Sequence, residues 1–190
     1  TDSSTNFDFP PYRELSDEAL AERITAVRQQ LDNELLILGH HYQQDEVIAH
    51  SDLRGDSYQL SKMAASNPDC RWIVFCGVHF MAEVADILTR DDQTVILPDM
   101  AAGCSMADMA NLRNVERAWR ELSEVLEPDE QITPVTYINS AADLKAFCGR
   151  HGGIVCTSSN ARGVLDWSFS RREKVLFFPD QHLGRNTGYD

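Results

Sequence analysis

Short apolar runs alternate along this chain with segments in which apolar residues recur every three or four positions. The runs have the length of buried strands, and the periodic segments are typical of helices that cover one face of a sheet. Continuous apolar strands separated by helices indicate small parallel sheets in repeated three-layer αβα modules, the α/β class. The predicted strands are residues 34–39, 71–76, 94–97, 133–138, 153–156 and 174–178, and the predicted helices are residues 57–65, 81–88, 112–126, 141–147 and 161–167.

A further helix is predicted near the start of the chain. Ser16 can cap it, because a serine hydroxyl accepts a hydrogen bond from a free backbone N–H of the first turn. Asp17 and Glu18 then fall at the positive end of the helix dipole, where carboxylates are favoured. One face of this helix carries Leu20, Ile24, Val27 and Leu31.

Both ends of the chain differ from its middle. Residues 1–13 are polar and contain two prolines, which predicts a flexible amino-terminal arm. The first residue is Thr1 rather than methionine, and the final residues follow a strand-like run and its loop with no closing helix predicted. We therefore expect the chain to be a piece of a longer protein.

A weak internal repeat divides the rest of the chain. Ile73-Val74 recurs as Ile154-Val155, and Pro98-Asp99 recurs as Pro179-Asp180, both at an offset of 81 residues. Four matched positions suggest a repeat without proving one. We predict a first αβα domain over residues 14–110 and a second, truncated αβα domain over residues 111–190.

Charge and composition exclude several classes of partner. The chain has 30 acidic and 17 basic residues, and its net charge of −13 repels phosphate backbones and anionic lipid, so we expect no nucleic acid and no membrane as partner. No apolar stretch is long enough to span a bilayer and no export segment is recognisable, which favours a cytoplasmic location. The five irregularly spaced cysteines fit reduced thiols or metal ligands better than a disulfide framework.

Candidate chemistry lies in the loops after the predicted strands, because parallel α/β sheets bind ligands at the carboxyl ends of their strands. His40, His41 and Tyr42 follow the first strand. They could move protons or ligate a metal, or they could form a polar loop whose histidines are hydrogen-bonded within the protein. Ser57 opens a helix whose free amides suit a carboxylate or a phosphate, although a simple helix cap explains it equally well.

The second half of the chain carries hydroxyl and amide side chains at the corresponding places. Residues 136–140 (Thr-Tyr-Ile-Asn-Ser) follow its first strand, and residues 156–160 (Cys-Thr-Ser-Ser-Asn) follow its second. Four polar loops at strand ends predict a pocket for a small, oxygen-rich anion. The sequence contains no phosphate-binding lysine loop and no Gly-x-Gly-x-x-Gly fingerprint, so the usual kinds of nucleotide binding are unsupported.

Cys104 is the one thiol placed in a loop that could present a ligand. It follows Gly103 and a strand-like run that stops at Pro98, and no other cysteine is near it in the sequence. Such a thiol is either a nucleophile or one ligand of a metal centre. Cys76 and Cys156 end apolar runs, which predicts small buried residues.

Seven segments of the chain resemble motifs of the quinolinate synthases, in that family's order. The resemblance covers nearly the whole chain outside the amino-terminal arm. The segments are residues 39–43 (Gly-His-His-Tyr-Gln), 55–60 (Gly-Asp-Ser-Tyr-Gln-Leu), 77–83 (Gly-Val-His-Phe-Met-Ala-Glu), 97–105 (Leu-Pro-Asp-Met-Ala-Ala-Gly-Cys-Ser), 137–139 (Tyr-Ile-Asn), 156–160 and 178–184 (Phe-Pro-Asp-Gln-His-Leu-Gly).

This resemblance implies an activity, a fold and a cofactor. Quinolinate synthases condense iminoaspartate with dihydroxyacetone phosphate to quinolinate in de novo NAD biosynthesis, and an aspartate-oxidising enzyme supplies the iminoaspartate. Their fold has three similar α/β domains around a pseudo-threefold axis, of which this chain would contain two. Three cysteines, one per domain, hold a 4Fe-4S cluster whose open iron acts as a Lewis acid.

The resemblance also implies roles for single residues. Cys104 becomes the first cluster ligand, and two further cysteines and the third domain are expected beyond residue 190. The 190 residues alone are then expected to hold no stable cluster and to have no activity. His40 and Tyr42 become the groups that move protons, whereas the role of His41 stays open. The substrate-binding positions that the resemblance implies are His40, Ser57, Tyr137, Asn139 and Ser158.

Two functions of other classes compete with this interpretation. The first is a zinc or manganese hydrolase in which Cys104 is merely a loop thiol. The second is a module that binds small anions without catalysis, in which replacing Cys104 would leave ligand affinity unchanged. The candidate ligands of the hydrolase are His40, His41 and His50, with Asp45, Asp52 and Asp56 nearby.

Overall fold

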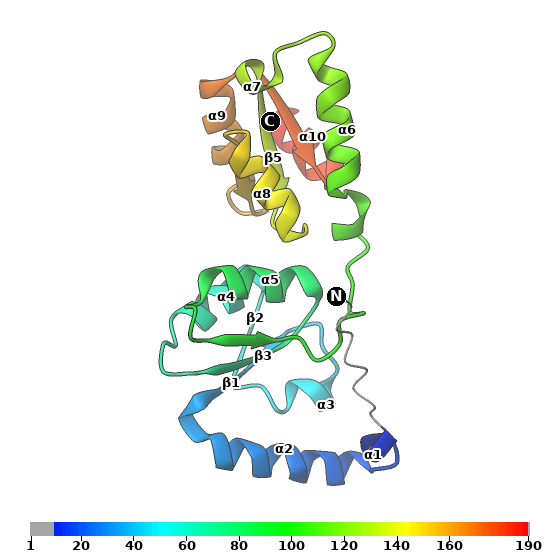
Figure 1. Cartoon of the computed structure of the whole chain (residues 1–190), viewed down its shortest axis with the longest axis vertical. Helices are drawn as coiled ribbons and strands as arrows, with labels where there is room; N and C mark the ends of the chain where they lie inside the picture. The colour runs from blue at the N-terminus through cyan, green and yellow to red at the C-terminus, as the bar shows by residue number, and fades with distance from the viewer. Residues whose placement is uncertain (1–9, 190) are drawn as a thin grey trace.

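Two all-parallel sheets with helices between their strands form the computed structural model, which describes residues 10–189 and confirms the predicted α/β class (Figure 1). The first half contains α1 (Pro10–Arg13), α2 (Asp17–Leu31), β1 (Leu35–His40), α3 (Asp45–Ile48), β2 (Leu53–Gly55), α4 (Ser57–Ala65), β3 (Trp72–Cys76), α5 (His79–Leu88) and β4 (Thr94–Ile96). The second half contains α6 (Leu112–Ser123), α7 (Pro128–Gln131), β5 (Ile132–Tyr137), α8 (Ala142–Arg150), β6 (Ile154–Cys156), α9 (Ala161–Arg171), β7 (Lys174–Phe178) and α10 (Gln181–Tyr189).

The first sheet has the strand order β2-β1-β3-β4. Strand β1 pairs with β3 from Leu35↔Trp72 to Gly39↔Cys76, and it pairs with β2 only near its carboxyl end. Helices α4 and α5 contribute to the core that packs on this sheet, and each large aliphatic or aromatic side chain buried there contributes about 1.5–3 kcal/mol when fully removed from water. The members without exposed surface are Leu38, Leu60, Ala64, Ile73, Phe75 and Ala85.

The second sheet has the strand order β6-β5-β7. Its central strand β5 contains Pro134, and Val135 pairs with Ile154 on one side and with Phe177 on the other. Two groups of buried side chains pack on it, and in one of them the Trp119 ring meets the Phe147 ring edge-on. The carboxyl end of β5 leads into the predicted polar loop and then into α8.

The structure describes only the last residues of the predicted amino-terminal arm, and these are helical. Residues 1–9 of the predicted arm lie outside the described residues, and Pro10–Arg13 forms the single helical turn α1. Ser16 caps α2, because its Oγ accepts a hydrogen bond from the backbone N–H of Ala19 at 3.3 Å. None of the residues of α2 is fully buried.

The structure contains elements that the sequence-based prediction lacks, among them the short helices α3 and α7, strand β2 and helix α10. Strand β2 was not predicted, because its three residues include Arg54 and Gly55 and show no apolar run. The loop predicted after β7 is wrong, since Gln181–Tyr189 forms α10. Asp180 starts this helix by accepting hydrogen bonds from the backbone N–H groups of His182 and Leu183, both at 2.9 Å.

The predicted repeat offset of 81 residues does not relate equivalent strands. It matches β3 to β6, yet β3 lies inside its sheet between β1 and β4, whereas β6 is an edge strand. The sheet orders instead place β1, β2 and β3 in the same arrangement as β5, β6 and β7, with the first strand of each series between the other two. The helix that follows β3, α5, is therefore the counterpart of α10.

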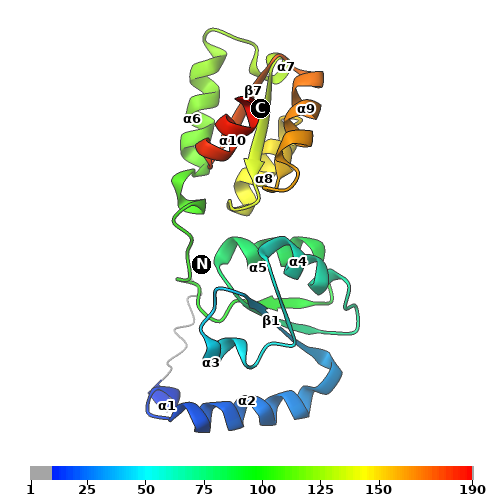
Figure 2. The ribbon, with the colours of Figure 1, turned by 180° about the vertical axis from the view of Figure 1, so that it is seen from behind.

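The two halves meet where α5 of the first half lies against α8 of the second, as the views from both sides show (Figures 1 and 2). This contact is next to the carboxyl ends of β3 and β5, the places at which the sequence predicts ligand-binding loops. Among residues 10–189, none of the helices combines the length and the apolar character that crossing a membrane requires.

Candidate functional site

His40, the last residue of β1, is the centre of a compact aromatic group. It is 4% exposed, and its ring lies 4.4 Å from the His41 ring and 4.8 Å from the Tyr42 ring, measured between centroids. Tyr42 is 82% exposed and packs its ring edge against His41 at 4.3 Å. A buried imidazole and an exposed phenol thus share one strand end; the sequence predicted the shared strand end but not the difference in exposure.

The surroundings of His40 keep its imidazole neutral. Burial lowers the pKa of His40, the nearby His41 lowers it further, and Asp56 acts in the opposite direction. The Nδ1 atom of His40 accepts a hydrogen bond from the backbone N–H of Tyr42 at 3.4 Å. This contact assigns the ring proton to Nε2, which lies 3.5 Å from the Ser57 hydroxyl.

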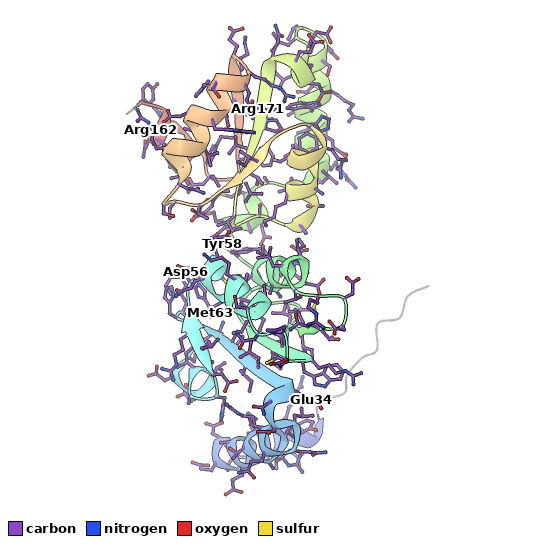
Figure 3. The ribbon with its side chains drawn as sticks, turned by 90° about the vertical axis from the view of Figure 1, so that its left-hand side faces the viewer. Glu34, Asp56, Tyr58, Met63, Arg162 and Arg171 are labelled. Atoms are coloured by element: carbon purple, nitrogen blue, oxygen red, sulfur yellow. The ribbon has the colours of Figure 1, made fainter. Side chains whose placement is uncertain are left out.

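Ser57 lies at the start of α4, next to the aromatic group. The N-cap of this helix is Asp56, whose Oδ1 accepts a hydrogen bond from the backbone N–H of Gln59 at 2.8 Å. Asp56 and Tyr58 lie at the end of the first half that faces the second half, whereas Glu34, before the amino end of β1, lies far from it (Figure 3). The predicted helix opening is confirmed, and one of its amides is already occupied by Asp56.

Tyr137 and Ser158 bring the loops after β5 and β6 together. Burial raises the pKa of Tyr137, a side-chain hydrogen bond with Ser158 lowers it, and Asp180, Cys156 and Cys104 raise it. The Tyr137 hydroxyl therefore keeps its proton and can donate a hydrogen bond to an anion.

Several hydroxyl groups of the second half hold its loops rather than face a ligand. Thr136 and Ser140 have no exposed surface; the Thr136 hydroxyl donates to Ser140, and the Ser140 hydroxyl donates to the carbonyl oxygen of Tyr137 at 2.7 Å. Asn160 accepts from the backbone N–H of Thr157 at 2.7 Å. The prediction that all these side chains form one pocket is therefore too broad, and Tyr137, Asn139 and Ser158 are the residues left for it.

Cys104 lies in a cleft of about 210 Å³ between the two halves. Its loop is joined to the start of α5, because the backbone N–H of His79 donates to the carbonyl oxygen of Ala102 at 3.0 Å. The second half contributes Ala141 and Asp143, at the start of α8, and Asn111, the N-cap of α6. The remaining residues that line the cleft are His79, Phe80, Gly103, Ala107, Asp108 and Ala110.

The described residues around Cys104 supply one suitable metal ligand but not a complete metal site. Cys104 is half-buried and free, which fits one thiolate ligand at the cleft. Burial raises the pKa of Cys148 and of Cys156 to about 12 each, so both stay protonated thiols. Within residues 10–189, no group of three His, Cys, Asp or Glu side chains lies close enough together to hold a metal ion.

The structure does not bring the ligands of the competing hydrolase together. His50 lines a cleft that also includes Leu35, at the amino end of β1, whereas His40 lies at the carboxyl end of the same strand. Asp52 is already used as well, since it pairs with Arg28 and its Oδ2 accepts from the backbone N–H of Ile37 at 2.7 Å. A zinc or manganese site built from these histidines is therefore unsupported.

Sequence reasoning missed the residues that join the two halves beside the cleft. The sequence predicts only helical positions for Glu83 and Lys145, and it places His79 in a family motif without a role. Their contacts connect α5 with α8, and no local pattern of the sequence reports a contact between residues so far apart. The available signal was a mostly apolar helix that carries two acidic residues, Glu83 and Asp86, within residues 79–88 (His-Phe-Met-Ala-Glu-Val-Ala-Asp-Ile-Leu).

Comparisons with known proteins match most of the chain. The family model described as quinolinate synthetase A protein matches residues 22–190. The chain is 70% identical over 187 residues to a quinolinate synthase of Rhodopirellula baltica, covering 93% of this chain and 47% of the relative. It is 58% identical over 176 residues to one of Corynebacterium glutamicum, covering 93% of the chain and 44% of the relative. The chain thus spans about half the length of the curated relatives it matches.

Proposed function

The chain belongs to the quinolinate synthase family, and on that premise we propose that it supplies two αβα domains, residues 14–110 and 111–190, of an enzyme that makes quinolinate for NAD biosynthesis. The substrates would be iminoaspartate and dihydroxyacetone phosphate. The observation that carries the proposal is the family match over residues 22–190, which includes both the His40 group and the Cys104 loop.

The two halves would hold the two substrates from opposite sides. Ser57 and the neutral His40 present a hydroxyl and a ring N–H, which suit phosphate or carboxylate oxygens. Tyr137, Asn139 and Ser158 present a protonated phenol, an amide and an exposed hydroxyl from the second half. Binding both substrates between these loops would bring their reacting carbons together and exclude water from them.

Tyr42 is the proposed group that moves a proton at the reacting atoms. Its phenol is exposed and held at the strand end by ring contacts with His40 and His41. His40 is a second candidate for proton transfer, but its Nδ1 is engaged by the backbone of Tyr42. We therefore give Tyr42 the acid/base role and His40 mainly a binding role.

Cys104 would contribute one thiolate to a 4Fe-4S cluster. When bound, such a cluster with an open iron supplies a Lewis acid that polarises a substrate oxygen or nitrogen. The position of Cys104 in the cleft between the halves supports this role. A supply of iminoaspartate requires an enzyme that oxidises aspartate, and the five free cysteines are consistent with a cytoplasmic, reducing location.

We expect the 190-residue chain on its own to bind less than one cluster per chain. The described residues place one suitable thiol in the cleft, and a 4Fe-4S cluster needs three or four thiolates. Anaerobic incubation with iron and sulfide, followed by analysis of both elements, measures this directly. A stoichiometric cluster that persists after gel filtration would contradict the expectation.

A chimera tests the proposed activity. Residues 22–190 of this chain would replace the matching segment of the Rhodopirellula baltica relative, and quinolinate formation would be measured with iminoaspartate generated from aspartate in the assay. We expect the chimera to form quinolinate, His40→Gln to lower kcat/KM strongly, and His50→Gln to leave it unchanged because His50 lies at the other end of β1. A chimera that binds its cluster but forms no quinolinate would refute the proposal.

A further inference from the structure

Helix α8 begins without a cap from its own segment. Its N-cap residue is Ala141, which has no side-chain acceptor, whereas α2, α4 and α6 are capped by Ser16, Asp56 and Asn111. The backbone N–H of Ala142 is nevertheless bonded, because it donates to Oε2 of Glu83 at 2.8 Å. Glu83 belongs to α5, so a carboxylate of the first half caps a helix of the second half.

The other oxygen of Glu83 points to the wall of the Cys104 cleft. Oε1 lies 3.5 Å from Nδ1 of His79, one turn earlier on α5, and His79 lines the cleft together with Cys104. The Glu83 side chain is 26% exposed, so its contacts are partly shielded from water. One carboxylate thus connects the cleft wall of the first half with the start of α8.

Lys145 makes a return contact from α8 to α5. Its Nζ lies 5.7 Å from the centre of the Phe80 ring and donates a hydrogen bond to the carbonyl oxygen of Ser140. Burial lowers the pKa of Lys145 to about 8, while Glu83, Asp143 and Cys148 act to raise it. Ser140 ends the loop that carries Tyr137 and Asn139. Lys145 therefore contacts both this loop and Phe80 of α5.

We propose that Glu83 is a positioning residue that holds the Tyr137–Ser140 loop against the Cys104 cleft by capping α8 across the interface between the halves. The contact itself follows from the geometry alone, and only its catalytic consequence rests on the proposed function. A cap supplied by another part of the fold makes the start of α8 dependent on the placement of α5. Loss of the carboxylate would let the start of α8 and its loop move away from the first half.

Amide hydrogen exchange of Ala142 tests the contact in this chain. Glu83→Ala removes the acceptor and should speed exchange of this amide about fivefold, the factor expected for the loss of a typical cap. Glu83→Gln keeps an oxygen acceptor of the same length and should restore most of the protection. Glu116→Ala, an exposed glutamate of α6, is the control and should change nothing at α8.

The outcomes separate this inference from the proposed function. An Ala142 amide that exchanges equally fast in the native chain and in the Glu83→Ala variant would overturn the inference, and so would equal acceleration throughout β5, which would mean general unfolding. In the chimera, Glu83→Ala should raise KM more than it lowers kcat, and Glu83→Gln should recover KM. If the unsubstituted chimera forms no quinolinate, the proposed function fails while the exchange result still decides the contact.

Discussion

Replacing Gly153 by alanine is expected to destabilise the second half of the chain by at least about 3 kcal/mol, at the upper end of the cost of overpacking. A Cβ at this position would lie 1.9 Å from the carbonyl oxygen of Pro134 and 2.9 Å from its carbonyl carbon. These are backbone atoms of the central strand β5, so no side chain can rotate to make room. The strand β6 and the Ser158 loop that follows it would separate from β5.

Gly163→Ala is the matched control for this substitution. Gly163 lies inside α9 of the same half, and a Cβ there would meet no atom within 4 Å. Alanine should stabilise this helix by about 0.5–1 kcal/mol, because it loses less backbone freedom on folding than glycine does. Chemical denaturation of both variants, followed by circular dichroism, measures the two effects. Equal denaturation midpoints for Gly153→Ala and the native chain would contradict the expected clash.

The close approach at Gly153 also shows what the sequence could and could not predict about the fold. Among the described residues, apolar runs located six of the seven strands to within one residue or so, because strands of parallel sheets covered by helices are mostly apolar. Residues 174–178 and 57–65 were predicted with the observed bounds. The need for glycine at residue 153 was not visible, since it depends on a proline some twenty residues earlier.

The errors in the predicted fold also arise from contacts between distant parts of the chain. Helix α10 contains Gly184 and Gly188, which lower the helix propensity of the segment, and its stability comes from the Asp180 cap and from packing on α9 and β7. Strand β2 is short and polar, and only pairing with β1 makes it a strand. The offset of 81 residues paired strands that are not equivalent. Two strands can share a dipeptide because buried strands have similar composition, whereas equivalent strands are identified by their places in the two sheets.

The sequence predicted those residues of the candidate site that directly follow a strand. Strand ends had to place His40, Ser57, Tyr137 and Ser158 at the carboxyl edges of their sheets, and the strand pairing puts them there. The number of hydroxyl groups free to bind a ligand was not predictable, because the Thr136 hydroxyl donates a buried hydrogen bond to the Ser140 hydroxyl. The Glu83 cap was not predictable either, since its partners are 59 residues apart.

Tyr42→Phe is expected to lower the kcat of the chimera by at least about 100-fold, the usual effect of removing a general acid or base. The substitution removes one hydroxyl and keeps the ring that contacts His40 and His41 at 4.8 and 4.3 Å. Because Tyr42 is 82% exposed, the free energy of unfolding should change by less than about 0.5 kcal/mol. The KM values should change little, since the binding groups on both halves stay in place.

Tyr58→Phe is the control that separates a catalytic hydroxyl from a merely exposed one. Tyr58 lies on α4, is 41% exposed, and its ring contacts the Lys62 ammonium at 4.9 Å. Steady-state kinetics of both variants should show a fall in kcat for Tyr42→Phe alone. A Tyr42→Phe enzyme with native kcat and raised KM would assign the phenol to binding instead. Proton transfer would then fall to the neutral imidazole of His40, whose Nδ1 could accept a proton only after releasing the backbone N–H of Tyr42.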